Sequence, residues 1–516
     1  MSFEILNITI LIVIILAGTI IKFPFLLNST GDDWVSNYVI DKKTLKPSIS
    51  LDKSIFPLIL YYPPLHYYFI SLFKKQNRYL IGSLLNLIYD AISTIIIYIF
   101  TQYYFSYYFN MNDVAANYAL VSSALFIFSP LITPIHARIQ GLKTRSLGTL
   151  VSIIYFISLY CFIKEENYLF FVFSILIGLL SFTCSQMAYQ NITFISITLS
   201  LISLSIKPII ILILIILISL LIPNFNIFGI ILHKYKHFKW YIKNLKDSPI
   251  RERGNIKSLI KSFILIKNKK YLSAFIELLI HNPILIALLS APHIFYIISD
   301  QLIKGDINTI MNSNFKLASY LALSGFIIFL VTSIKPFIVA GESERYLECV
   351  HPFFTLVFIH IYSSNLDFYK IIFVFLLMNI IIIITNLIII ERNRYYDNLY
   401  QFNNDNIEDL LTFINNHNIK EKSIATDPPK LAFLLSTHIK GENLKFLYGF
   451  GDDLKNGWEW MNNYFDSYNE LKSDLNWYKT HSGIHYIVVY KKYINSNKYK
   501  DYNIIYSTDS FNVILL

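Results

Sequence analysis

Long apolar runs separated by short polar stretches dominate the chain up to about residue 390. The run from Ile209 to Ile222, for example, contains only Ile, Leu and one Ser. A helix needs roughly 20 apolar residues to cross a hydrocarbon core of about 30 Å. Run length and flanking polar residues predict about eleven membrane spans, and one long tract is divided at Lys207-Pro208 because Pro favours a first helical turn. The predicted spans lie near residues 4–25, 79–102, 114–133, 146–163, 168–184, 190–206, 208–227, 281–299, 316–334, 347–363 and 370–390.

The pattern changes beyond residue 390, where apolar residues follow the shorter periods of soluble helices and strands. These periods predict helices over 407–414 and 431–435, and strands over 423–426, 484–490 and 503–504. The expected fold class is therefore mainly α. A polytopic transmembrane helical bundle over residues 1–390 is followed by a small soluble α/β domain over 391–516.

Composition supports a membrane location. Hydrophobic residues make up 54% of the 516-residue chain, which is more apolar surface than a soluble core of this size can bury. The net charge of +10 is then interpreted as a topology signal and as attraction to anionic lipid headgroups, and nucleic-acid binding is not expected. We expect an integral, multi-pass protein of the cell membrane, with the first apolar segment retained as a helix.

The segment 234–270 is strongly basic, with twelve Lys or Arg residues and two acidic residues. Within it, Ile256, Leu259, Ile260, Phe263 and Ile264 have helical spacing. This pattern predicts a helix that lies along the membrane surface with its charges in solvent or on lipid headgroups.

Two carboxylates, Asp32 and Asp33, follow directly on the first span and precede Trp34, an aromatic residue that favours membrane interfaces. A carboxylate there can act as a general base or bind a divalent cation such as Mg²⁺ or Mn²⁺. The alternative is that the acidic pair starts an interfacial helix, because Asp is a favoured N-cap.

Further along the same loop, Tyr62, Pro63, Pro64 and His66 form part of a rigid aromatic segment that re-enters the membrane. The two prolines restrict the backbone, and Pro64 suits the first turn of a helix. The aromatic faces can stack on a sugar, or they can anchor the next helix at the interface.

These two features, placed between a first and a second span, resemble the GT-C class of membrane glycosyltransferases. The resemblance implies a multi-span enzyme that takes a sugar from a polyprenyl-phosphate donor and uses an acidic residue of the first outward loop as its base. Asp32 and Asp33 match that acidic position, and the Tyr-Pro-Pro-Leu run at 62–65 matches a motif common in the family. The resemblance implies a glycan, lipid or protein acceptor at the outer membrane face, where the soluble domain is also expected.

The resemblance extends to Asp90 in the second span, to the loop 136–145 and to the segment 341–346 before the tenth span. A carboxylate within a span is costly unless it is paired, neutral or facing a cavity, so Asp90 is a candidate site residue. The alternative is a structural hydrogen bond from Asp90 to another helix, beside Asn86 one turn earlier. Candidate substrate-binding residues in the other two segments are Arg138, Lys143, Arg145, Glu344 and Arg345. The cations can stabilise a departing phosphate, or they can lie at the interface as solvated charges.

The sequence leaves open the orientation of the protein in the membrane and two other classes of function. Basic residues in the loop 26–78 favour the reverse orientation by the positive-inside rule, although long loops contribute little to that rule. A polysaccharide polymerase, flippase or transporter would share the spans and the buried polar residues, but a transporter commonly shows repeated halves with broken helices. A non-enzymatic scaffold would tolerate replacement of Asp32 and Asp33.

Overall fold

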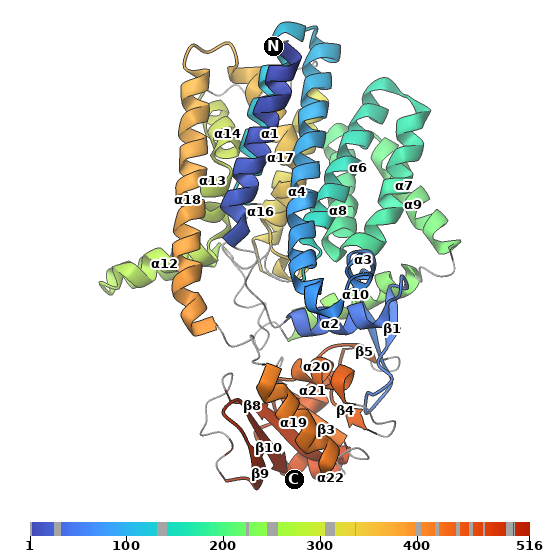
Figure 1. Ribbon diagram of the computed structural model, residues 1–516. Helices are drawn as coiled ribbons and strands as arrows, with labels where there is room; N and C mark the ends of the chain where they lie inside the picture. Colours follow the sequence, from blue (N-terminus) through green and yellow to red (C-terminus); the bar gives the residue numbers. More distant parts are fainter. Residues whose placement is uncertain are drawn as a thin grey trace. The chain divides into compact units, whose positions relative to one another are not determined.

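The computed structural model describes residues 3–24, 32–131, 142–222, 227–244, 256–304, 315–335, 337–397, 404–417, 423–439, 444–453, 458–467, 470–491, 499 and 501–516. The described chain is mainly helical with a few short strands (Figure 1). It divides into two compact units. Unit 1 comprises Met1–Asn28, Tyr79–Ile222 and Glu252–Glu391, and unit 2 comprises Ser29–Arg78, Pro223–Arg251 and Arg392–Leu516.

Unit 1 is a bundle of helices in which α6 packs against α7, and α16 packs against α17. A π-helical turn, Tyr104–Tyr108, extends α4. The helices are α1 (Phe3–Lys22), α4 (Arg78–Tyr103), α5 (Asn112–Ile127), α6 (Arg145–Glu165), α7 (Tyr168–Cys184), α8 (Gln186–Ser203), α9 (Lys207–Leu220), α11 (Lys257–Lys267), α12 (Tyr271–His281), α13 (Pro283–Ser290), α14 (Pro292–Lys304), α16 (Lys316–Thr332), α17 (Arg345–Tyr362) and α18 (Phe368–Asp397).

Each predicted span coincides with a helix, but fewer helices than predicted are suited to crossing a membrane. Among the described residues, four are long and apolar enough: Glu4–Lys22, Lys75–Tyr108, Arg145–Glu165 and Phe368–Thr385. A fifth is possible if α13 and α14, which meet at a bend of 100°, form one broken span. The predicted number of eleven is thus not reproduced. Helix length is one reason: the 14 residues of α9 extend for only about 21 Å.

Unit 2 is built around a five-stranded mixed sheet in the order β4-β3-β8-β10-β9. Strand β3 pairs in parallel with β4 and β8, while β10 pairs antiparallel with β8 and β9. The strands are β3 (Ser423–Asp427), β4 (Lys445–Phe446), β8 (Ile484–Tyr490), β9 (Ile504–Ser507) and β10 (Phe511–Leu515). The helices and strands predicted for the tail are found there, together with β4 and β10 of this sheet, which the sequence did not indicate.

Four helices and the strands of two smaller sheets complete the described tail part of unit 2. The helices α19 (Asn404–Asn416) and α20 (Leu431–His438) correspond to the two predicted ones, and α22 (Asn476–Ser482) precedes β8. The remaining elements are α21 (Trp460–Tyr464), β6 (Phe465–Ser467), β7 (Glu470–Leu471) and β5 (Asp452–Asp453).

The first loop of the chain is part of the same unit as the tail. Its strands β1 (Ser48–Ser50) and β2 (Leu58–Tyr61) form an antiparallel sheet with β5 of the tail. The ammonium group of Lys53 donates to the carbonyl oxygens of Ser436 and Ile439, at 3.2 and 2.6 Å. Lys53 of the loop therefore donates to carbonyl groups at the C-terminal end of α20, where the last carbonyl groups of a helix have no partner within the helix. The predicted domains are continuous stretches, whereas unit 2 interleaves the loop with the tail.

Helix α10 (Ile227–Lys243) carries the first part of the basic segment and also belongs to unit 2. Its His233 is buried, and Nδ1 lies 3.3 Å from Oδ2 of Asp452. Burial lowers the pKa of His233, and the neighbouring Asp452 opposes that shift. The ring of His233 also contacts Tyr61 of β2 and Trp458, so α10 is packed by aromatic contacts on both the loop and the tail.

Candidate functional site

The sequence-predicted site residues fall into two groups, one in each unit. In unit 2, the helix α2 (Asp32–Lys42) begins at the acidic pair, so both carboxylates belong to its first turn. The side chain of Asp33 is buried, and Trp34 beside it is buried as well. The side chain of Asp32 lies outside the described residues. A carboxylate in the first turn of a helix is stabilised by the amide groups and dipole of the helix N-terminus.

The segment that contains Tyr62, Pro63, Pro64 and His66 leads into the short helix α3 (Leu65–Ser71). Pro64 is the N-cap residue of α3, and its carbonyl oxygen accepts from the backbone N–H of Tyr68 at 2.8 Å. Both prolines are buried, and so is His66. This segment is therefore packed inside unit 2, and α3 lies against α2.

Tyr67 of α3 contacts both α2 and the segment that contains Tyr62, and it was not among the site residues predicted from the sequence. Its ring contacts Tyr62 at a centroid distance of 5.1 Å, and the hydroxyl of Ser36 on α2 donates to the Tyr67 oxygen at 3.4 Å. Burial raises the pKa of Tyr67 well above its usual value, and Tyr62 and Asp33 act in the same direction. The phenol thus stays protonated near a carboxylate. Its only signal in the sequence was its place beside His66.

His66 is a neutral residue in this cluster at physiological pH, because burial lowers its pKa from 6.5 to about 3. A depressed pKa means that the unfolded chain binds more protons than the folded chain between these two values. The contribution of neutral His66 to the free energy of unfolding is therefore fully present above pH 6.5. It falls by about 1.4 kcal/mol for each pH unit as the pH falls toward 3. We expect His66→Gln to remove that contribution, measured as a shallower decline of the unfolding midpoint between pH 6.5 and 4.5. An identical decline in both proteins would contradict a buried neutral His66.

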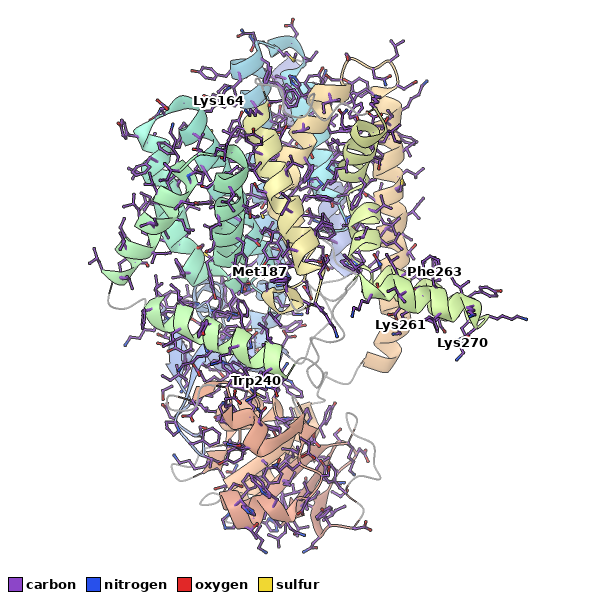
Figure 2. The ribbon with its side chains drawn as sticks, turned by 180° about the vertical axis from the view of Figure 1, so that it is seen from behind. Lys164, Met187, Trp240, Lys261, Phe263 and Lys270 are labelled. Carbon is purple, nitrogen blue, oxygen red and sulfur yellow. The ribbon has the colours of Figure 1, made fainter. Side chains whose placement is uncertain are left out.

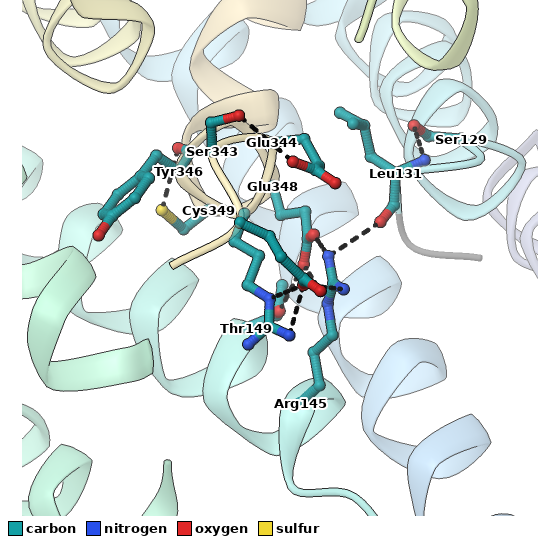
Figure 3. A network of polar contacts seen from close by, with 11 residues as sticks. Ser129, Leu131, Arg145, Thr149, Ser343, Glu344, Tyr346, Glu348 and Cys349 are labelled. Carbon is teal, nitrogen blue, oxygen red and sulfur yellow. Dashed lines mark hydrogen bonds and ion pairs between the residues drawn. The ribbon is translucent and has the colours of Figure 1, made fainter. Parts of the chain in front are cut away.

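In unit 1, Arg145 at the start of α6 is the centre of a polar network (Figure 3). Its Nε donates to Oε2 of Glu348 on α17 at 3.1 Å, and Thr149 donates to the same oxygen at 3.2 Å. A guanidinium NH2 group also forms an ion pair with Glu348 and donates to the carbonyl oxygen of Leu131 at 3.4 Å. Glu348 is 3% exposed, so the charge of Arg145 is largely offset by a buried carboxylate.

The segment before α17 adds a second arginine to this network. Arg345 donates to Oε2 of Glu342 at 2.6 Å, and the same oxygen lies 3.8 Å from Arg145 Nη1. Glu344 accepts from the hydroxyl of Ser343 at 3.4 Å. Arg145 and Arg345 of the predicted set therefore meet at Glu342, and Glu348 adds a second carboxylate to Arg145. Lys143 is described, whereas Arg138 lies outside the described residues.

Asp90 of α4 has a partner that the sequence did not indicate. Its Oδ2 lies 3.0 Å from Nζ of Lys22, the last residue of α1, and the two side chains are 4% and 1% exposed. Asn86 is also buried, but neither of its amide atoms has a hydrogen-bond partner among the described residues. Asp90 thus bonds to another helix, as its structural alternative predicts, and its partner there is the ammonium group of Lys22. The signal available in the sequence was a single lysine at the end of the first apolar run.

A divalent cation was a candidate cofactor at Asp32 and Asp33. Within the described ranges, no group of three or more His, Cys, Asp or Glu side chains is placed to hold a metal ion. Searches of protein-family models and of curated proteins find no match for the chain.

Proposed function

We propose that the chain is an integral, multi-pass protein of the cell membrane with a GT-C-like glycosyltransferase activity. It would transfer a sugar from a polyprenyl-phosphate-linked donor to a glycan, lipid or protein acceptor at the outer membrane face. Four long apolar helices support the membrane location. The observation that carries the activity is the cluster of buried Asp33, Ser36 and Tyr67 where α2 packs against α3, with the half-buried Tyr62 beside Tyr67.

The proposed reaction is a single displacement with inversion at the sugar. The acceptor hydroxyl gives its proton to the carboxylate of Asp33, and its oxygen forms a bond to the anomeric carbon. The bond between that carbon and the phosphate oxygen breaks, and polyprenyl phosphate leaves with the electron pair. A base within reach of the acceptor proton is required for this step. Asp32 is the second candidate for that role.

The departing phosphate gains a negative charge, so a cation near it would stabilise the transition state. Arg138, Lys143, Arg145 and Arg345 are the proposed candidates. Arg145 and Arg345 already pair with Glu348 and Glu342, so a phosphate would compete with these carboxylates. A divalent cation could supply the same charge, and Mg²⁺ or Mn²⁺ would suit carboxylate ligands such as Asp32 and Asp33.

A polysaccharide polymerase, flippase or transporter is a second candidate, and one observation favours it. The helices α13 and α14 meet at a bend of 100° and together are apolar enough for one span. Broken helices of this kind line substrate sites in many transporters. This class predicts movement of an intact lipid-linked sugar across the bilayer without cleavage of the sugar–phosphate bond.

The test is an assay of purified full-length protein in liposomes with a panel of polyprenyl-phosphate donors that carry a radiolabelled sugar. The proposal predicts labelled product together with free polyprenyl phosphate in equal amounts. Movement of the intact donor between leaflets without cleavage would favour the flippase. If no donor gives labelled product and no donor moves between leaflets, both candidate functions are wrong.

A further inference from the structure

The helices α11 and α12 form a hairpin that projects from unit 1. In Figure 1, α12 runs across the direction of the long helices α1, α4 and α18 of the same unit. Figure 2 labels Lys261, Phe263 and Lys270 on this projecting part. The hairpin is tied to unit 1 at its base, because the N–H of Ile256 donates to the carbonyl oxygen of Ser333 at 3.2 Å.

The hairpin has small or polar residues inside and large apolar residues outside. Ser258, Ser262 and Ala274 are each less than 5% exposed. The amide of Asn282 donates to the hydroxyl of Ser258 at 3.1 Å, and Lys261 and Glu277 form an ion pair at 2.8 Å between the two helices. Five large apolar side chains are 55–72% exposed: Ile260, Phe263, Ile264, Leu272 and Phe275. Small residues at helix contacts and apolar residues facing outward are typical of helices in lipid.

The helices are too short to cross a bilayer. Each has 11 residues, which corresponds to about 16 Å, against the roughly 30 Å of a hydrocarbon core. A short amphipathic helix that runs across the direction of the spans suits the plane of the interface, where its apolar face enters the acyl region by about 5–10 Å.

Lysines gather at the turn of the hairpin. Lys267 is the last residue of α11, and Lys269 and Lys270 form the turn before α12. All three are exposed, and among the described residues none of them forms an ion pair with an Asp or Glu side chain. Ammonium groups beside an apolar face match the phosphates of anionic lipid headgroups above an acyl layer.

We propose that the α11–α12 hairpin is an interfacial element that inserts Phe263 and its apolar neighbours into one leaflet and binds anionic phospholipid through Lys267, Lys269 and Lys270. The inference rests on the proposed membrane location but not on the proposed glycosyltransferase reaction. Its occupant is a bilayer surface rather than a protein, because the apolar face is bordered by cations and lies crosswise to the apolar helices.

The first experiment measures the depth of spin labels on the full-length protein in lipid nanodiscs, from relative accessibility to oxygen and to a water-soluble nickel complex. Three single sites are labelled after replacement by cysteine: Phe263 in the hairpin, Phe373 on α18 and Leu366 in the loop before α18. All three are exposed, and the native cysteines are buried. We expect Phe263 and Phe373 to be protected from the nickel complex, and Leu366 to be accessible.

An accessible Phe263 with a protected Phe373 would overturn the hairpin proposal alone. If all three sites are accessible, the membrane location itself fails. Protection of Phe263 only in discs that hold two copies would assign the face to a second copy and would also overturn the proposal.

The second experiment tests the lipid headgroup. A fluorophore at Leu272→Cys reports energy transfer from headgroup-labelled lipid, either anionic or neutral, present as a minor component of neutral discs. We expect enrichment of the anionic lipid, with about a 5-fold preference per lysine at low salt. The triple variant Lys267→Gln, Lys269→Gln, Lys270→Gln should lose it, whereas Lys479→Gln, on an exposed lysine of unit 2, should retain it. Equal enrichment in the triple variant would refute the role of these lysines.

Discussion

Replacing Asp33 by asparagine is expected to reduce sugar transfer by a factor of about 10² to 10⁴, the usual contribution of a general base. Asparagine keeps the shape of the side chain and its ability to accept hydrogen bonds, but it cannot take the acceptor proton. The buried setting of Asp33 beside Tyr67 makes that loss specific to chemistry, because no large cavity is created. The measurement is the initial rate of labelled product formation in liposomes, with the same amount of folded protein in each sample.

Two controls make this result interpretable. Asp52→Asn removes the same charge from the same unit at an exposed pair with Lys42, and we expect its rate to match the parent. Asp32→Asn tests the neighbouring carboxylate. If Asp33→Asn keeps full activity while Asp32→Asn loses it, Asp32 is the base; if both single variants and the double variant are active, the proposed mechanism is wrong.

Replacing Lys22 by methionine is expected to lower the free energy of unfolding by about 3–5 kcal/mol, because it leaves the carboxylate of Asp90 buried without its cation. The pair joins α1 to α4 inside unit 1, with both side chains almost fully covered. An apolar surrounding makes an unpaired charge especially costly. The free energy of unfolding is measured by denaturant titration of the purified protein in detergent, and the thermal unfolding midpoint is recorded beside it.

The double variant Lys22→Met, Asp90→Leu separates the charge from the packing. With both ionic groups removed, we expect stability to return close to that of the parent protein. Lys370→Met breaks an exposed pair with Asp367 and should change stability by no more than about 1 kcal/mol. A double variant as unstable as the single one would mean that the ion pair is not the source of the loss.

The positions of the helices were predictable because an apolar run sets where a helix can form, and every predicted span except 281–299 coincides with a single helix. The number of helices suited to crossing a membrane was not predictable, because composition does not fix where a helix ends. The apolar tract after Lys207, for instance, gives a helix that ends at Leu220, well short of the predicted residue 227. The bend between Ser290 and Pro292 likewise divides one predicted span into two helices.

For the site, nearness in sequence decided what could be predicted. Asp33, Tyr62 and His66 lie within one loop, and the structure gathers them around α2 and α3. The partners of Asp90 and Arg145 are 68 and 203 residues away. Such pairs depend on how helices pack against each other, which no local pattern specifies. Glu348 had a faint signal, as a lone carboxylate inside an apolar run.

The interleaving of the first loop with the tail has a consequence for biosynthesis. Lys53 and Ser436, which are bonded in unit 2, are 383 residues apart in the chain. At about 5–20 residues per second, a ribosome needs roughly 20 to 75 s to make that stretch. During this interval the edge of β2 has no sheet partner, and an unpaired edge is a site for wrong pairing. Unit 2 therefore completes its folding after most of unit 1 has been synthesised, and a chaperone that covers the loop would act in that window.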